Sequence, residues 1–268
     1  MQTQELIKRL DAAFDKRRAG DPSTALDEFE HLEKLSTHPQ DIAAIRLFQV
    51  MCLTDLGRIE EADQRIRLVN EKKLDDVDRI DYESEYARIK RVEGLTTEAL
   101  ERVERALHLS ETVEDKRRVE IASKSLQALR GVLLAESGNC NEAIPILEEV
   151  PPDVPWWADA RLLLGDCSYR SRRYREAIDY YLSLISSANH VESVIRNDAF
   201  RNIGCAYHQL GDYAKAAEYL SNIKDAYDQY PEIKAKLFGF LASAYSHLGM
   251  TQEAAKYSGF SRGSSSVQ

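Results

Sequence analysis

The feature that most constrains this chain is a small residue followed twelve positions later by alanine, which recurs seven times. Small side chains mark places where two backbones can pack closely, because a larger group there would hold the segments apart. Intervals between successive first members range from 34 to 44 residues, whereas the spacing within each pair is constant. The sequence therefore predicts one compact unit used seven times. The pairs are Ala13 and Ala25, Val50 and Ala62, Ala87 and Ala99, Gly131 and Ala143, Gly165 and Ala177, Gly204 and Ala216, and Ala242 and Ala254.

A glycine stands seven residues after the first member of six of these pairs, and Arg172 takes this place in the remaining one. Glycine just past the end of a helix adopts a left-handed conformation without a Cβ clash. The pattern therefore predicts helical hairpins, with the first helix of each ending at this position. The glycines are Gly20, Gly57, Gly94, Gly138, Gly211 and Gly249.

The unit at residues 198–223 shows the pattern most clearly, with apolar residues at helical spacing in both halves. It reads Phe200-x2-Ile203-Gly204-x2-Tyr207 and then Ala216-x3-Leu220. These residues resemble the tetratricopeptide repeat, whose pattern is W-x2-L-G-x2-Y followed by A-x3-F. Here phenylalanine stands for the tryptophan and leucine for the last phenylalanine.

The resemblance implies an all-α fold, a right-handed α-solenoid of about seven tetratricopeptide-like hairpins over residues 1–258. The segment PPDVP at 151–155 closes one helix, and a hinge is expected there. Residues 259–268 are polar and glycine-rich, so they are predicted to form a flexible tail. No polar cap follows Tyr257, and self-association through the uncapped C-terminal repeat is one expectation.

Composition narrows the classes of partner. Hydrophobic residues make up 43% and charged residues 30% of the chain, which is the balance of a folded, water-soluble protein. The net charge of -9 argues against a nucleic-acid partner, since nucleic acids bind to positive surfaces. The first residues include acidic side chains and lack an apolar core region, so neither a secretory signal nor a membrane span is expected. A cytoplasmic location is predicted.

No sequence pattern indicates a catalytic residue, a cofactor or a metal site. P-loop, GxGxxG, HExxH and EF-hand patterns are absent. A GxSxG match at 259–263 lacks the preceding strand that a nucleophile elbow requires. The four cysteines are far apart, so reduced packing thiols are expected. His208 and His247 fall at similar places in successive units and are interpreted as polar groove residues, with a metal or pH-dependent contact as the alternative.

In tetratricopeptide proteins the first helices of successive hairpins line a concave groove, and the resemblance implies the same here. Positions three before, one after and four after each small residue are expected to face it. Each apolar member could equally pack within the chain, and ion pairing with Glu85 is the alternative for Arg88 and Arg91. The predicted partner-binding residues are Leu47, Met51, Ser84, Arg88, Arg91, Asp166, Tyr169, Arg201, Asn202, Cys205, His208, Lys236 and Ser243.

Chaperone-binding members of the family hold a terminal carboxylate with lysine, asparagine and arginine side chains from three successive units. Asn202 and Lys236 stand at two of the matching places. The other three are occupied by Leu162, Asp166 and Phe240. A role in binding chaperone tails is therefore not expected.

The leading hypothesis is a non-enzymatic protein–protein interaction scaffold that binds a protein segment or peptide in its concave groove. The alternative is a peptide-sensing regulator whose superhelix changes pitch on ligand binding, because the joints near residues 70–80 and 110–120 are long. An enzyme is the third hypothesis, and no residue supports it. No cofactor, nucleic acid or membrane is expected as a partner.

Overall fold

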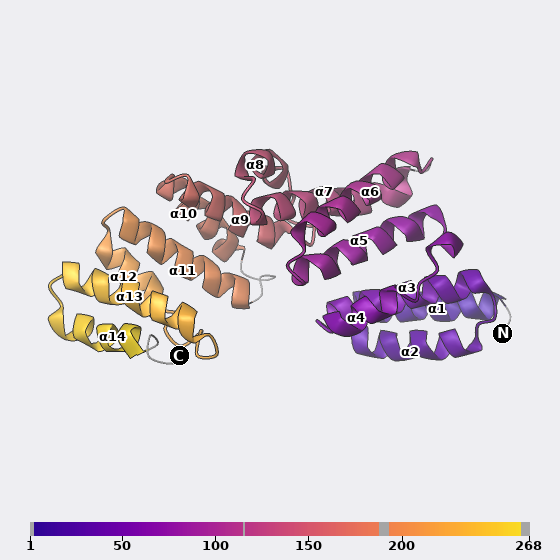
Figure 1. The fold of residues 1–268 in the computed structure, drawn as a ribbon, viewed down its shortest axis with the longest axis horizontal. Coiled ribbons are helices and arrows are strands. Elements are labelled where there is room, and N and C mark those ends of the chain that lie inside the picture. Colours follow the sequence, from indigo (N-terminus) through magenta and orange to yellow (C-terminus); the bar gives the residue numbers. More distant parts are fainter. Residues whose placement is uncertain (1–2, 115, 188–192, 264–268) are drawn as a thin grey trace. The chain divides into compact units, whose positions relative to one another are not determined.

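The computed structural model describes residues 3–114, 116–187 and 193–263, and over these residues it contains fourteen α-helices, one short 3₁₀ helix and no strand (Figure 1). The chain divides into two units, residues 1–137 and 138–268, each of which is described by itself. Antiparallel helical hairpins recur in both units, so the predicted all-α solenoid fold is confirmed. None of the described helices combines the length and apolar composition that a bilayer crossing requires.

The first unit contains three hairpins and one further helix. The hairpins are α1 (Thr3–Arg18) with α2 (Pro22–Leu35), α3 (Pro39–Asp55) with α4 (Ile59–Ile66), and α5 (Asp76–Val92) with α6 (Thr96–Thr112). The last helix, α7 (Lys116–Glu136), packs against α5 and α6. The joint between α4 and α5 includes the 3₁₀ helix η1 (Glu71–Lys73), which contacts α3.

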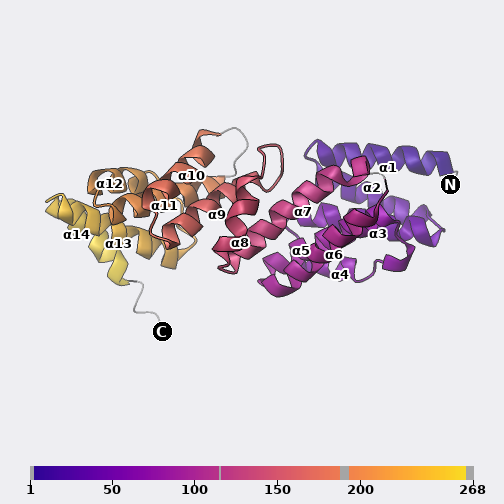
Figure 2. The ribbon, with the colours of Figure 1, turned by 90° about the horizontal axis from the view of Figure 1, so that it is seen from above.

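The second unit begins with α8 (Cys140–Glu148), which packs against α9. Its hairpins are α9 (Trp157–Arg170) with α10 (Tyr174–Ser186), α11 (Ser193–Gln209) with α12 (Tyr213–Ser221), and α13 (Pro231–His247) with α14 (Thr251–Gly263). Helix α11 contacts both α9 and α13, so the three first helices follow one another (Figure 2). The units divide at the turn of the fourth predicted hairpin, which therefore gives one helix to each unit.

The turns between paired helices have the left-handed residues that the sequence indicates. All six predicted glycines have positive φ, for example +79° at Gly211. Arg172 adopts φ +61° at the one place where glycine is missing. Asp21 and Asp212 then begin second helices by accepting hydrogen bonds from the amides of Thr24 and Lys215, at 3.0 and 3.2 Å. Such caps satisfy amide donors at the start of a helix, and so define each turn locally.

Two of the predicted small residues allow helices to pack at a distance that no larger residue permits. A Cβ placed on Gly204 would lie 2.5 Å from Leu220 Cγ and 3.3 Å from the carbonyl oxygen of Ala216. A Cβ on Gly165 would lie 2.2 Å from Cε1 of Tyr181. These contacts confirm, at Gly165 and Gly204, the prediction that a small residue stands where paired helices meet.

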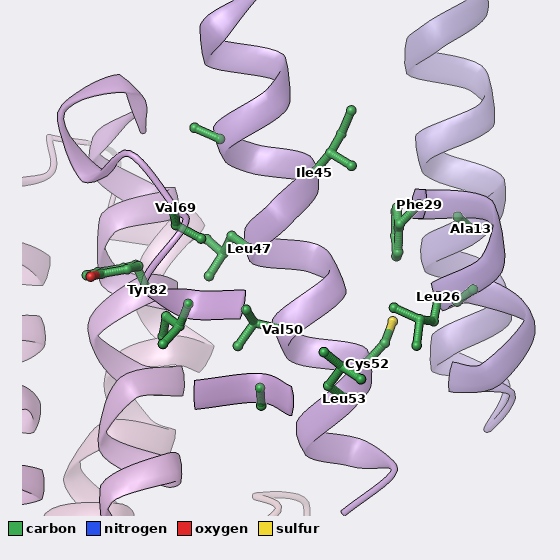
Figure 3. Packing of buried hydrophobic residues seen from close by; sticks show 14 of the residues in the cluster. Ala13, Leu26, Phe29, Ile45, Leu47, Val50, Cys52, Leu53, Val69 and Tyr82 are labelled. Carbon is green, nitrogen blue, oxygen red and sulfur yellow. The ribbon is translucent and has the colours of Figure 1, made fainter. Parts of the chain in front are cut away.

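The core of the first unit runs through α1 to α5 (Figure 3). The ring centroid of Phe14 lies 5.4 Å from that of Phe29 and 4.5 Å from that of Phe48, both in edge-on geometry. Aromatic pairs of this kind stabilise a core beyond the area they bury. The rings therefore join α1, α2 and α3 at one point.

Leu47 belongs to this core, which contradicts the prediction that it lines an accessible groove. Its side chain is fully buried, and Figure 3 shows it on the side of α3 that faces Val69 and Tyr82. Val69 and Leu74, from the joint between α4 and α5, are buried in the same cluster. The long joint thus covers a position that the repeat pattern alone would leave open.

Cys140 and Cys167 form a disulfide between α8 and α9, with their Cα atoms 5.5 Å apart. The prediction that all four cysteines are reduced is therefore wrong. The two cysteines are 27 residues apart and belong to different predicted hairpins, so their spacing gives no signal. The packing of α8 on α9 brings them together. Cys52 and Cys205 are free thiols.

The C-terminal helix α14 continues to Gly263, so the first five residues of the predicted tail are helical. Residues 264–268 lie outside the described residues. Residues 151–155 form a turn in which Val154 is buried. The hinge expected there stays a prediction.

Candidate functional site

Ion pairs connect the first helices of the first unit along the positions predicted to face the groove. Arg17 of α1 donates from Nε to Asp55 Oδ2 of α3 at 2.6 Å. Arg88 of α5 donates from Nη1 to Glu85 Oε1 at 2.8 Å, and its Nη2 reaches Asp55 Oδ1 at 3.4 Å. Arg91 of α5 donates from Nη2 to an oxygen of α7, Oε1 of Glu136, at 2.7 Å. We call Arg17, Asp55, Glu85, Arg88, Arg91 and Glu136 the charge ladder.

Arg88 and Arg91 were predicted to bind a carboxylate of a partner. In the charge ladder, both of them instead contact carboxylates of this chain. The alternative noted for Arg88, an ion pair with Glu85, is the arrangement in the structure. A ligand would have to displace Glu85 or Glu136 to reach these guanidinium groups. A binding role for Arg88 and Arg91 therefore stays a prediction.

Two further predicted residues lie near the charge ladder. Met51 is half-buried, with its Sδ 3.9 Å from Arg17 Nη1, and Ser84 is a half-buried residue of α5. Asp81, also on α5, was not predicted. Burial, together with the neighbouring carboxylates, raises the pKa of Asp81 to about 7, although Arg17 acts to lower it. This carboxyl therefore exchanges its proton near neutral pH.

The second unit contains a cavity of about 240 Å³ between α9, α10, α11 and α13. Five of the predicted binding residues line it. They are Asp166, Tyr169, Arg201, Asn202 and Cys205. Three further lining residues were not predicted, and these are Arg170, Tyr181 and Phe240. We call this cavity, with these eight residues, the α9–α13 pocket.

Tyr181 was not predicted because it lies on α10, the second helix of its hairpin. Only the first helices were expected to line the groove. The Tyr181 ring passes over Gly165, where any side chain would overlap with it. The hydroxyl thereby reaches Asp166 Oδ1 at 2.6 Å. A glycine at the small position with a tyrosine sixteen residues later is the sequence signal that could have indicated this wall. Phe240 stands at a place already singled out by the comparison with carboxylate-binding repeats.

Side-chain hydrogen bonds connect the polar residues of the α9–α13 pocket. Asn202 Nδ2 donates to Asp166 Oδ1 at 2.9 Å, and Arg201 Nε donates to Asn202 Oδ1 at 3.2 Å. Arg201 Nη1 also contacts Asp198 Oδ1 at 2.8 Å. Tyr227 donates to the same Asp198 oxygen at 2.8 Å. The chain of contacts fixes the orientation of Asp166 and Arg201 without a ligand.

Burial alters the pKa of two titrating groups that line the α9–α13 pocket. Burial raises the pKa of Asp166, although the Tyr181 hydroxyl and the nearby arginines lower it. Burial also raises the pKa of the Cys205 thiol to about 11, which keeps it protonated at neutral pH. A thiol in that state is a weak nucleophile. The pocket is thus suited to binding and lacks an activated nucleophile at Cys205.

His208 and Ser243, which were both predicted to bind a partner, lie together beside the pocket. His208 Nε2 and Ser243 Oγ are 2.8 Å apart. The His208 ring stands edge-on to Phe240 with centroids 5.2 Å apart. Burial lowers the pKa of His208, and His247 lowers it further. The pair therefore supports the Phe240 wall.

The last predicted residue, Lys236, is exposed on α13 and does not line the α9–α13 pocket. Within the described part of the chain, no group of three or more histidine, cysteine or acidic side chains could hold a metal ion. The pocket thus has hydrogen-bonding, charged and aromatic groups as its recognition elements.

The fold is that of a helical-hairpin solenoid, and the α9–α13 pocket lies among the helices of its second unit. Comparison with protein families identifies residues 128–192 and 199–223 as tetratricopeptide repeats. These two stretches of the chain are therefore tetratricopeptide repeats. No curated protein matches the chain in sequence.

Several solved structures share the fold at low sequence identity. The Rap protein complexed with competence and sporulation factor is 13% identical, with a TM-score of 0.69 over 98% of this chain and 77% of that one. NprR in complex with its cognate peptide NprX is 14% identical, with a TM-score of 0.68 over 94% and 76%. A tetratricopeptide repeat protein from Parabacteroides merdae is 16% identical, with a TM-score of 0.56 over 95% and 91%.

Proposed function

We propose that this chain is a non-enzymatic interaction scaffold that binds a protein segment or peptide, with the α9–α13 pocket as the anchoring site. The observation that carries the proposal is a 240 Å³ cavity with pre-oriented Asp166, Asn202 and Arg201 side chains. A pre-oriented site loses less entropy on binding than a flexible one. The similarity to the folds of the Rap and NprR complexes supports a peptide as the ligand.

The pocket has the size and composition of an anchor for one side chain. Tyr169 and Phe240 provide apolar surface, and the hydrogen-bonded polar groups provide specificity. The charge ladder, by contrast, has its arginines in contact with carboxylates of the chain. An extended segment would therefore contact the second unit through its anchor residue and use other groove positions for weaker contacts.

Selection of random peptides by display on the purified full chain tests this proposal. We expect wild-type protein to enrich a family of related peptides and Tyr169→Ala to lose them. Tyr219→Ala is the matched control. Both tyrosines are half-buried in the second unit, and each packs against at least one other tyrosine. Tyr219, however, does not line the pocket. Enrichment that survives Tyr169→Ala and Phe240→Ala would move the site elsewhere.

A peptide-sensing regulator is the second candidate. The division into two units at residue 138 supports it, because a joint is a place where a ligand could change the pitch of the superhelix. Small-angle scattering with and without a selected peptide distinguishes the candidates. A change in the profile at saturation favours the regulator, and an unchanged profile favours the scaffold.

A further inference from the structure

The charge of Asp166 has no cationic hydrogen-bond partner among the described residues. Its two donors, the Tyr181 hydroxyl and the Asn202 amide, are neutral, and both contact Oδ1. Within the described chain no donor contacts Oδ2. Carboxylates in poorly solvated places are normally compensated by a cation, since an unpaired charge is costly there. Oδ2 is thus an acceptor available to an occupant of the pocket.

The two arginines of the pocket wall do not provide this compensation through a direct contact. Arg201 is held by Asp198 at 2.8 Å, and the two charges of that pair cancel. Arg170 is exposed to water, which screens its interaction with Asp166. Both arginines lower the pKa of Asp166 from a distance, but the hydrogen bonds that this carboxylate accepts come from neutral donors.

Aromatic residues line the same cavity as this carboxylate. They are Tyr169, Tyr181 and Phe240. Ring faces attract cations, most strongly where water is excluded. A half-buried acid that shares its cavity with aromatic rings is a better environment for a cation than either feature alone.

We infer that the α9–α13 pocket takes a cationic group, an ammonium or a guanidinium, which contacts Asp166 Oδ2 and lies against the aromatic rings. The inference rests on the proposed function, because the cation belongs to the bound segment. It is a lysine or arginine side chain, or the amino terminus of the segment. A cavity of 240 Å³ has room for one such group.

Titration of the isotope-labelled full chain with small capped amino acids, followed by NMR, tests the inference. N-acetyl-arginine amide and N-acetyl-lysine amide represent the side chains, and norleucine amide with a free amine represents the amino terminus. N-acetyl-citrulline amide has nearly the shape of the arginine probe without its charge, and N-acetyl-glutamate amide has the opposite charge. Asp166→Asn is the test variant, and Asp179→Asn removes an exposed charge of the same unit as the control.

We expect at least one cationic probe to bind about tenfold more tightly than citrulline amide, with shifts at Asn202 and Cys205. The preference should disappear in Asp166→Asn and persist in Asp179→Asn. The cationic probe that binds most tightly identifies the source of the charge. Equal or tighter binding of the citrulline or glutamate probe overturns the inference, and so does the absence of saturable shifts at the pocket for every probe.

The display selection separates this inference from the proposed function. Enriched peptides that share a basic residue or a free amino terminus, lost on Asp166→Asn, support both. Enriched peptides without a common cation support the proposed scaffold function and contradict the inference that the pocket takes a cationic group. If no peptide is enriched, the proposed function fails, and the NMR titration still decides whether the pocket binds cations.

Discussion

In the first unit, Arg17 and Arg91 stand four residues after the small residue of their repeats, and each contacts a carboxylate of a neighbouring helix. In the second unit the same repeat position holds Tyr169, which lines an open cavity, and His208, which supports its wall. The two units thus use equivalent positions for different purposes. Charged pairs occupy these positions in the first unit, and neutral donors leave a carboxylate oxygen without a hydrogen bond in the second.

This comparison indicates that the position of a residue in the repeat does not by itself make its side chain available to a ligand. An arginine at a groove position is available to a ligand only if no neighbouring helix offers it a carboxylate. A carboxylate becomes a recognition group when its local donors are uncharged, as Tyr181 and Asn202 are for Asp166.

Reduction of the Cys140–Cys167 disulfide should weaken the second unit and leave the first unchanged. Loss of this crosslink should lower the free energy of unfolding by about 2–4 kcal/mol, because the unfolded chain gains freedom. Thermal unfolding with and without dithiothreitol measures the effect, and Cys140→Ser should abolish the sensitivity to the reductant. Thiol titration in denaturant should find the two free cysteines, Cys52 and Cys205, before reduction. Four thiols in the untreated protein would contradict the crosslink.

Gly165→Ala should destabilise the second unit by about 2 kcal/mol, because the new methyl group would displace the Tyr181 ring from its contact with Asp166. The control is Gly239→Ala on α13, where nothing lies within 4 Å of the added carbon. That change should be neutral or stabilise the helix by up to about 1 kcal/mol. Chemical denaturation of both variants gives the comparison, and equal effects would mean that Tyr181 is not held as described.

Asp81 should make the stability of the first unit depend on pH. Its pKa is raised to about 7 in the folded chain, whereas a free aspartate has a pKa near 3.9. The folded state therefore binds the extra proton, and its stabilising contribution is complete below the unfolded pKa and is lost as the pH rises through about 7.

Asp81→Asn should remove this pH dependence and stabilise the unit by about 2 kcal/mol at pH values above 7, allowing for partial solvation of the site. Denaturant titrations across this pH range measure the change. Asp76→Asn, at an exposed position of the same helix, should leave the slope as it is. If the stability of the wild type does not vary over this pH range, Asp81 does not have this raised pKa.

Arg91→Gln should have the smallest effect, below about 1 kcal/mol, because the ion pair with Glu136 is partly exposed. A double-mutant cycle with Glu136→Gln measures the coupling, which should fall as salt is added. Peptide capture by Arg91→Gln should equal that of the wild type. Loss of capture in this variant, with Tyr169→Ala still active, would place the binding site on the charge ladder.

Much of the fold follows from local patterns in the sequence. The small residues, the turn glycines and Arg172 predict the hairpins, because each acts through its own backbone or its immediate neighbour. The burial of Leu47 could not be predicted in this way. Its burial depends on a joint outside the repeat, and the pattern contains no information about where that joint folds.

The candidate site could be predicted only in part, for a related reason. Asp166 and Arg201 follow from repeat position and Asn202 from the comparison with carboxylate-binding repeats, and all three line one pocket. Tyr181 and the Cys140–Cys167 disulfide depend on packing between different helices, which sequence spacing does not encode. The internal partners of Arg88 and Arg91 likewise depend on which carboxylates the neighbouring helices bring near.

Hydrogen exchange of the full chain, with and without a peptide obtained by display, shows which helices the ligand contacts. We expect slower exchange in α9, α11 and α13, where most of the pocket residues lie, and little change in α1, α3 and α5. Protection confined to α1, α3 and α5 would contradict this expectation, because the ligand would then bind along the charge ladder.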